Sequence, residues 1–346
     1  MSREADQGVS RAGQGELRRG APVYGLGGQD TNCQIGVFAA YVSRHGHALI
    51  DRALDLPKSW TDDRPRRTAA HVPDAVRFAT RPRRAVSMSE RAMTAGVPFA
   101  WVSADSIYGV GEIEMKLRQT GKGYVLGVNA NSQFKSWNKP TVLAGTAEAI
   151  AQTLAPAAWR RRSAGEGSQG ARLYDWAYLE LADLAADDFH PNLRGTWTRG
   201  LLIRRRIADH DLAYFTTWGP AGTSIDTLVA VEGRRRAMED SFETARTELG
   251  LDHNESRSWH GWHRHVSLVM LAFARLATIR HHANQPVAAQ TPIRPRQSRK
   301  TTSSAGRSRR SAALPHVWRS GASSQPASSP GRFGGAPTRL PHNALI

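Results

Sequence analysis

Apolar residues alternate with short polar breaks through the first half of the chain, and this pattern predicts a β-hairpin followed by buried strands. Gln34–Val42 (QIGVFAAYV) and Ala48–Leu54 are the two apolar runs of the hairpin, with a polar turn around His45–His47. Pro98–Ser103 and Gly123–Val128 are nearly continuous apolar runs, which are typical of strands covered on both faces.

A helix is predicted between these two buried strands, over Val110–Gln119. The order strand, helix, strand indicates a right-handed parallel crossover. Asp105 follows the first of the two strands, at the end of the sheet where open α/β proteins place ligand sites. An earlier helix is predicted over Ser87–Ala95, and a loop over Trp60–Pro65, where we expect Asp62 and Asp63 in a solvated turn.

The second half of the chain is predicted to begin with a mostly β insertion over about residues 129–231. Its candidate strands are Trp197–Ile207, Leu212–Trp218 and Ile225–Val231. Two helices follow, at about Arg234–Leu249 and Arg257–His282. In the second helix the apolar stripe expected to face the core consists of Val266, Met270, Leu271, Phe273, Ala274, Leu276 and Ala277.

The two ends of the chain differ in composition from this central part. Residues 1–31 are rich in Gly and Arg without an apolar period, and residues 285–346 are rich in Ser, Pro, Arg and Gly. We therefore interpret residues 32–284 as the folded domain, residues 1–31 as disordered or out of frame, and residues 285–346 as a basic low-complexity tail.

The net charge favours a nucleic-acid partner, although its distribution is uneven. The 346 residues carry 47 Lys and Arg against 30 Asp and Glu, a formal charge of +17. Residues 285–346 hold 10 basic residues and no acidic one, so the rest of the chain carries only +7. The alternative is that the charge simply reflects a solvated basic tail. One cysteine, Cys33, excludes a disulfide framework, and with no secretory signal or membrane span in the sequence we expect a cytoplasmic protein.

Candidate chemistry centres on two carboxylates. Glu239 and Arg246 are seven residues apart in a predicted helix, so that both project from one face. Together with Asp105, Glu239 could bind Mg²⁺, which prefers oxygen ligands, although such sites usually use a third carboxylate. The alternatives are that Asp105 caps the helix beginning near Val110 and that Glu239 is a solvated helix residue.

A dense cluster of Trp, His and Arg begins the last predicted helix. Its spacing lacks the two-histidine pattern of a helical zinc site. Aromatic stacking and phosphate contacts suit this mixture, so we interpret the cluster as facing DNA. The alternative is a half-buried aromatic seam. The residues concerned are Arg257, Trp259, Trp262, His263 and Arg264.

At these residues the chain resembles DDE-type transposases of bacterial insertion sequences. The similar segments are Asn32–Ala40, Leu56–Asp63, Gly96–Gly109, Gly123–Val128 and Gly233–Arg280. In this superfamily the last catalytic block is marked by a motif of an Arg, a Glu and a Lys. Three residues separate the Arg from the Glu, and six separate the Glu from the Lys. Here the pattern falls on Arg235, Glu239 and Arg246, with Arg in place of Lys, and with Glu232 where the family has Tyr.

The resemblance implies an α/β, RNase H-like mixed sheet with flanking helices and a mostly β insertion before the last catalytic helix. It implies Asp105 and Glu239 as catalytic, metal-binding residues, with Mg²⁺ (or Mn²⁺) as cofactor. It further implies that Arg235, Arg246 and the Trp/His/Arg cluster bind double-stranded DNA, both element ends and target. We expect no membrane partner, and we expect the protein to form a homodimer on DNA.

The first catalytic Asp of the family has no counterpart that the sequence can identify. Asp6 lies near the expected place, but no apolar strand surrounds it. We therefore interpret the chain as a transposase for Mg²⁺-dependent strand cleavage and transfer, in a defective copy whose two ends are read out of frame. Translation of the other reading frames beside both ends tests this hypothesis. The alternatives are a catalytically inactive DNA-binding remnant that interferes with an intact transposase, and a chain that does not fold without its first strand.

Overall fold

A large mixed sheet organises the described part of the chain in the computed structural model. The structure describes residues 8–10, 23–24, 30–31, 33–140, 142–167, 170–284 and 344–345, all within a unit formed by Met1–Asn284 and Leu340–Ile346. The strand order is β1-β4-β14-β6-β7-β13-β12-β11-β10, and β5 pairs with β4. These strands are β1 (Gly8–Ser10), β4 (Cys33–Ser43), β5 (Gly46–Asp55), β6 (Trp101–Ala104), β7 (Gly123–Val128), β10 (Arg160–Gly167), β11 (Gly170–Ala185), β12 (Thr196–Arg205), β13 (Leu212–Pro220) and β14 (Ala344–Leu345).

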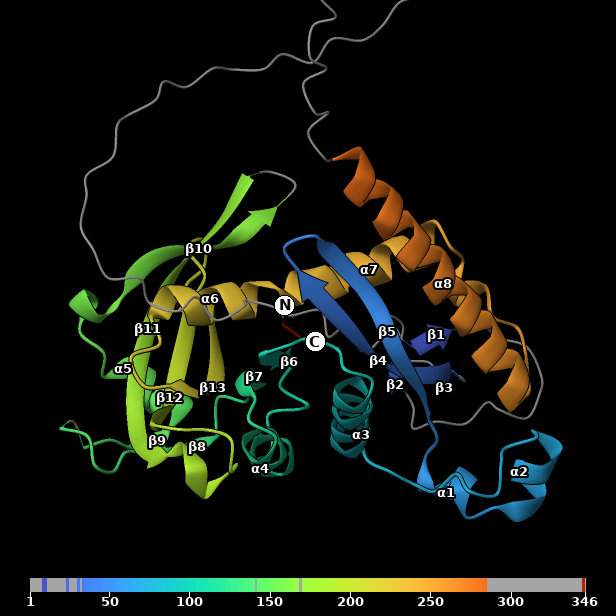
Figure 1. Ribbon diagram of the computed structural model, residues 1–346, viewed down its shortest axis with the longest axis horizontal. Coiled ribbons are helices and arrows are strands. Elements are labelled where there is room, and N and C mark those ends of the chain that lie inside the picture. The colour runs from blue at the N-terminus through green and yellow to red at the C-terminus, as the bar shows by residue number, and fades with distance from the viewer. Residues whose placement is uncertain are drawn as a thin grey trace, which may run out of the picture. The chain divides into compact units, whose positions relative to one another are not determined.

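Helices cover both faces of this sheet (Figure 1). They are α1 (Lys58–Thr61), α2 (Arg64–Ala69), α3 (Arg81–Thr94), α4 (Gly111–Gln119), α5 (Ala147–Gln152), α6 (Ile225–Gly233), α7 (Arg235–Thr247) and α8 (Trp259–Ala283). Short 3₁₀ helices are η1 (Pro156–Ala158), η2 (Ala186–Asp188) and η3 (Leu251–His253), and two small ladders pair β2 (Val23–Tyr24) with β3 (Asp30–Thr31) and β8 (Gln133–Lys135) with β9 (Ala144–Thr146). No helix in the described ranges is both long and apolar enough to cross a membrane.

The predicted hairpin and the predicted crossover are both confirmed. Strands β4 and β5 pair antiparallel, and β6 pairs parallel with β7 from Trp101 opposite Gly123 to Ala104 opposite Leu126. Helix α4 connects β6 to β7, as expected. The side chains of α4 and β7 are joined by a buried polar group, in which Arg118 and Tyr124 both bond to Glu114.

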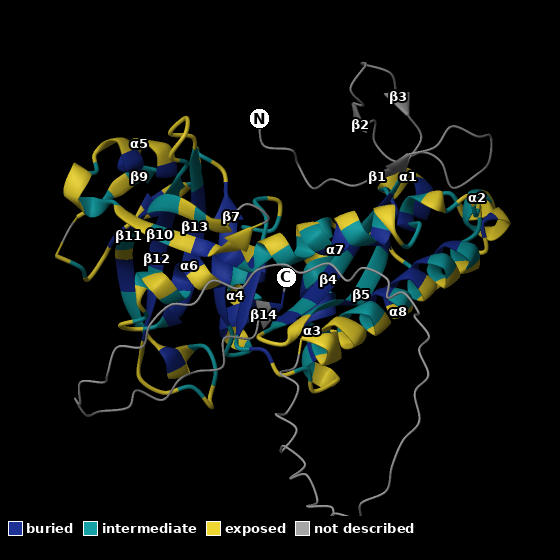
Figure 2. Cartoon of the chain, turned by 90° about the horizontal axis from the view of Figure 1, so that it is seen from above, coloured by how far each residue is buried: buried dark blue, intermediate teal, exposed yellow. Residues whose placement is uncertain are grey.

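Two hydrophobic cores, one on each face of the β4–β5 hairpin, hold the helices that surround the candidate site. Helices α7 and α8 pack on one face of the β4–β5 hairpin through Phe242, Val266 and Val269 among others. Helices α3 and α4 cover the opposite face, with Met88 and Leu117 fully buried. Figure 2 shows α8 with its inner face buried against β5 and its outer face exposed.

The β insertion is confirmed in its strands β12 and β13, but the predicted strand over Ile225–Val231 is wrong. This segment is helix α6, because the Ser224 hydroxyl accepts a hydrogen bond from the Thr227 backbone N–H, at 3.2 Å, and caps a helix. Its β-branched residues suit burial in either element, and Leu228, Val229 and Val231 are indeed buried.

Two smaller predictions are also corrected. Trp60–Pro65 is not a plain loop, since it contains the end of α1 and the start of α2. The Asp63 carboxylate accepts a hydrogen bond from the Arg66 backbone N–H and caps α2. In α8, Leu271 does not face the core, because its side of the helix turns outward and leaves it 67% exposed.

The interpretation of residues 1–31 and 285–346 lies largely outside the described residues. The structure describes only short strands from these two segments. They are β1, β2 and β3 in the first segment and β14 (Ala344–Leu345), which lies between β4 and β6, in the second. Leu345 is 2% exposed and packs with Met88 and Val102. At least this part of the last 62 residues therefore belongs to the core, which the composition of the segment did not predict.

Candidate active site

A cavity of about 110 Å³ opens where the end of β6 meets the start of α7. It lies between the β4 backbone and α7 and holds both carboxylates that the sequence singled out. Its lining consists of Ile35, Gly36, Val37, Phe38, Arg81, Ala104, Asp105, Ile107, Tyr108, Arg235, Met238, Glu239 and Phe242. Asp105 and Glu239, distant in sequence, thus face one space.

Close backbone approach holds Asp105 in place. A Cβ on Gly109 would lie 1.8 Å from the Gly127 carbonyl oxygen, and a Cβ on Gly127 would lie 2.8 Å from the Ser106 nitrogen. The loop after β6 can therefore lie directly on β7 only because both positions are glycine. Ser106 N–H donates to the Asp105 carboxylate at 2.7 Å.

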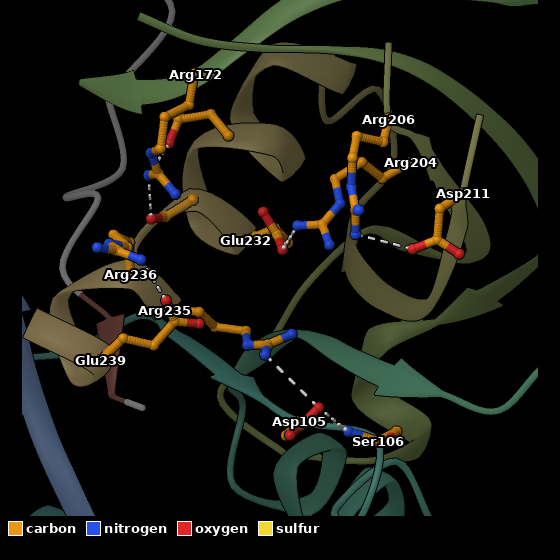
Figure 3. Close-up of polar contacts among 12 residues, drawn as sticks. Asp105, Ser106, Arg172, Arg204, Arg206, Asp211, Glu232, Arg235, Arg236 and Glu239 are labelled. Atoms are coloured by element: carbon orange, nitrogen blue, oxygen red, sulfur yellow. Dashed lines mark hydrogen bonds and ion pairs between the residues drawn. The ribbon is translucent and has the colours of Figure 1, made fainter. Parts of the chain in front are cut away.

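The capping interpretation of Asp105 is wrong, because the residue at the N-cap of α4 is Val110 and no side chain caps that helix. Asp105 instead forms an ion pair with Arg235, the first residue of α7, at 3.6 Å. The two side chains are 39% and 23% exposed, so that a ligand entering the cavity can reach both. Figure 3 shows Arg235 extending from α7 toward Asp105.

Glu239 lies one turn further along α7 and has its own arginine partner. The Arg236 guanidinium donates to the Glu239 carboxylate at 2.9 Å, and it also contacts the Asp240 carboxylate at 2.9 Å. The Glu239 side chain is 47% exposed. It is therefore a partly solvated helix residue, as the alternative supposed, and at the same time one wall of the cavity.

The two carboxylates suit a hard divalent ion only in part. Asp105 and Glu239 offer oxygen donors, and Mg²⁺ in proteins is commonly bound through one or two carboxylates together with substrate phosphates. Within the described ranges, however, no group of three or more His, Cys, Asp or Glu side chains is arranged to hold a metal ion. The donor set fits one ion shared with a phosphate and falls short of a two-ion site.

Glu232, which replaces the family's tyrosine, has a structural role that the sequence did not reveal. It is 3% exposed at the end of α6, and Arg204 of β12 donates to it at 2.8 Å (Figure 3). Arg204 also lies over the rings of Tyr174 and Phe215. The pair ties α6 to the β insertion immediately before α7 begins.

The aromatic residues predicted to face DNA are mostly packed against the protein. Trp262 is 2% exposed in the core between β4 and α8, and Trp259 is partly buried beside it. The His263 ring lies 4.1 Å from that of Trp259, and its Nδ1 is 2.9 Å from the Trp259 carbonyl oxygen. Burial lowers the pKa of His263 below its ordinary value. The aromatic seam is thus the better description of these residues.

The arginines predicted to bind DNA are placed differently. Arg257 and Arg264 are exposed near the start of α8, whereas Arg246 is half-buried on α7 and is not part of the cavity lining. Of the predicted cations, Arg235 alone lines the cavity. Contact of these side chains with DNA stays a prediction.

Part of the chain is similar to a known protein family. Residues 15–165 match the model of a family described as DDE superfamily endonuclease. The match includes Asp105 and ends before α7, so the assignment of Glu239 depends on the cavity and on the motif. It supports a DDE transposase-type family for this chain, and the mixed sheet with flanking helices is consistent with the RNase H-like fold of that class. No curated protein matches the chain.

Proposed function

We propose that this protein carries the DNA strand-cleavage and strand-transfer site of an insertion-sequence transposase. The observation that carries the proposal is the convergence of Asp105 and Glu239 on one cavity, from the end of a parallel strand and from the last helix before the Trp/His/Arg cluster. The reaction of such a site cuts a phosphodiester at the element end with water, and the freed 3′ hydroxyl then attacks target DNA.

Each cavity residue has a task in this chemistry. Oxygens of Asp105 and Glu239 would hold Mg²⁺ or Mn²⁺, which supplies a Lewis acid for phosphodiester chemistry. Arg235 and Arg236 neutralise these carboxylates in the absence of a ligand. A DNA phosphate in the cavity would accept two hydrogen bonds from the planar guanidinium of Arg235. This interaction would replace the ion pair of Arg235 with Asp105.

We further propose that the chain by itself binds DNA without cutting it. Chemistry of this kind usually employs a third carboxylate, and the described residues contain no third acid in the cavity. The isolated chain then acts as the inactive DNA-binding remnant that the sequence suggested, able to compete with an intact transposase for element ends. Dimer formation on DNA is part of this proposal.

The experiment measures binding and cleavage separately on the purified chain. Duplexes from the two ends of the element that encodes the chain are titrated at 50 and 200 mM salt, and nicking is followed with Mg²⁺ or Mn²⁺. We expect salt-dependent binding and no cleavage. Absence of binding at low salt contradicts the DNA-binding proposal, and nicking abolished by Glu239→Gln contradicts the proposed inactivity.

A thermal-shift experiment tests the two carboxylates without requiring cleavage. Mn²⁺ at 100 times its Kd is expected to stabilise the protein by about 2.7 kcal/mol. Asp105→Asn and Glu239→Gln should each abolish most of this stabilisation. Glu243→Gln, an exposed acid on the same helix, is the matched control and should leave it unchanged.

A further inference from the structure

Each carboxylate of the candidate site is paired with an arginine of α7. Asp105 lies 3.6 Å from Arg235, and Glu239 accepts a hydrogen bond from the Arg236 guanidinium at 2.9 Å (Figure 3). A metal ion that binds these carboxylates needs the same oxygens that the arginines contact. The two arginines therefore compete with a metal ion for the site.

The contact between Arg236 and Glu239 can open without leaving Arg236 unpaired. Helical spacing of three and four residues places Arg236 beside both Glu239 and Asp240, and the Arg236 guanidinium contacts Asp240 at 2.9 Å. The three side chains are between 44% and 47% exposed. They can therefore exchange partners without any change in the core, while Asp240 keeps the guanidinium close to the site.

Asp105 likewise keeps a hydrogen bond when Arg235 leaves it. The Ser106 backbone N–H donates to the Asp105 carboxylate at 2.7 Å, independently of Arg235. Arg235 and Glu239 lie four residues apart on α7, and both line the cavity. Release of Arg235 thus leaves Asp105 in position, and the freed guanidinium stays beside the cavity, where it can bind another anion.

We propose that Arg235 and Arg236 couple the binding of a divalent metal ion to the binding of a DNA phosphate. A phosphate diester accepts hydrogen bonds from both guanidinium groups, which then release Asp105 and Glu239. Conversely, when the two carboxylates hold a metal ion, the arginines are released for a phosphate. Each ligand therefore raises the affinity of the protein for the other. This inference rests on the proposed function, because the phosphate is taken to be that of DNA.

The size of the coupling follows from the strength of the two ion pairs. Exposed ion pairs are weak, so the loss of one should change the affinity for a metal ion about two- to fivefold. The two pairs together contribute a factor on the order of ten, which is usual for linked sites. By linkage, Mn²⁺ changes the affinity for DNA by the same factor as DNA changes the affinity for Mn²⁺. The coupling can therefore be measured from the DNA side.

The first experiment measures Mn²⁺ binding to the intact chain without DNA, from the electron paramagnetic resonance signal of the free ion. Arg236→Gln should raise the affinity for Mn²⁺ about two- to fivefold, because Glu239 loses its competing partner. Arg275→Gln removes one positive charge from an exposed position of α8 and is the control. It should leave the affinity unchanged. An unchanged affinity in Arg236→Gln overturns the inference.

The second experiment measures the coupling itself. The affinity for a fluorescent element-end duplex is measured by anisotropy with and without saturating Mn²⁺, at constant ionic strength. The ratio of the two affinities is the coupling factor, and Arg236→Gln should reduce it about two- to fivefold. Direct contact between ion and phosphate adds to the factor in both proteins and cancels in this comparison. An equal factor in both proteins shows that the Arg236 charge acts on Mn²⁺ only from a distance, which overturns the inference.

The outcomes distinguish this inference from the proposed function. If the chain does not bind the duplex, the proposed function fails. Dimethyl phosphate then replaces the duplex as the phosphate diester, and its effect on the affinity for Mn²⁺ is measured. A smaller effect in Arg236→Gln than in the parent supports the coupling, and equal effects overturn it. If the chain binds DNA but the coupling factor does not depend on Arg236, the coupling fails and the proposed DNA binding stands.

Discussion

At the scale of single residues, the buried pair of Glu232 and Arg204 should contribute strongly to stability. Arg204→Ala leaves an almost fully buried carboxylate without its partner, and breaking such a pair costs about 3 kcal/mol in the free energy of unfolding. Urea denaturation followed by tryptophan fluorescence measures the change.

The neighbouring Arg205 provides the control for this prediction. Arg205→Ala breaks a pair with Asp175, which keeps Arg161 as a second partner. Its cost should stay below about 1 kcal/mol. Equal losses in the free energy of unfolding for the two variants would show that burial does not strengthen the contribution of the Glu232–Arg204 pair. The presence of Glu232 where the family has Tyr would then need another explanation.

Two half-buried histidines should make stability depend on pH. Burial lowers the pKa of His47, opposed in part by nearby Asp240 and reinforced by Arg280, and burial likewise lowers the pKa of His263. Each is neutral in the folded protein where the unfolded chain, with an ordinary histidine pKa of about 6.5, already binds a proton. Stability should therefore fall as the pH drops below about 6.5.

Melting temperatures at pH 7.5 and pH 5.5 measure this dependence. His47→Gln and His263→Gln should each reduce the difference between the two pH values, because one source of proton uptake on unfolding is lost. If neither substitution changes the difference, acid destabilisation has its origin in other groups.

At the scale of elements, the segment between β6 and α4 should not tolerate a methyl group at Gly109, whereas the first residue of α4, Gly111, should. Gly109→Ala places a Cβ 1.8 Å from a backbone oxygen of β7, so the loop carrying Asp105 must shift, at about 1–3 kcal/mol. It should also reduce the stabilisation by Mn²⁺, because Asp105 moves relative to Glu239.

Gly111 is the matched control, two residues further along the chain. A Cβ there meets nothing within 4 Å, and Gly111 begins α4 with no unusual backbone requirement. Gly111→Ala should stay within about 0.5 kcal/mol of the parent and keep the Mn²⁺ response. A comparable loss at both glycines would mean that close packing on β7 does not position Asp105.

Local patterns predicted the elements where one period dominates. The apolar runs at β4 and β7 left no competing interpretation, and the acid-rich, amphipathic sequence of α7 predicted its helix. Ile225–Val231 misled because its residues favour strands, while the deciding feature was one capping hydroxyl on Ser224. Trp262 misled because an aromatic residue beside arginines suits DNA and suits a core equally well.

At the scale of the whole molecule, sequence spacing could propose the site but could not assemble it. That Asp105 and Glu239 line one cavity depends on how α7 packs across β4, a contact between distant segments. The insertion of β14 into the sheet was beyond local patterns for the same reason. Two residues near the end of a Ser-, Pro- and Arg-rich segment carry no periodic signal, and their neighbours are chosen by the fold.

The distribution of charge over the molecule gives a final prediction, about how it holds DNA. Of the net charge of +17, the ten basic residues of 285–346 supply the larger part. Each phosphate contact adds about 0.9 to the slope of log K against log salt concentration. If the site contributes orientation and the last segment contributes affinity, replacing Arg307, Arg309 and Arg310 by Gln should lower affinity and reduce the slope by up to about 3. Replacing the exposed Arg257 and Arg264 should instead reduce the preference for element ends over unrelated DNA. Titrations of element-end and unrelated duplexes at four salt concentrations measure the salt slope and the preference for element ends. A loss of this preference on replacing Arg307, Arg309 and Arg310 would contradict the prediction that the last segment contributes affinity and not specificity.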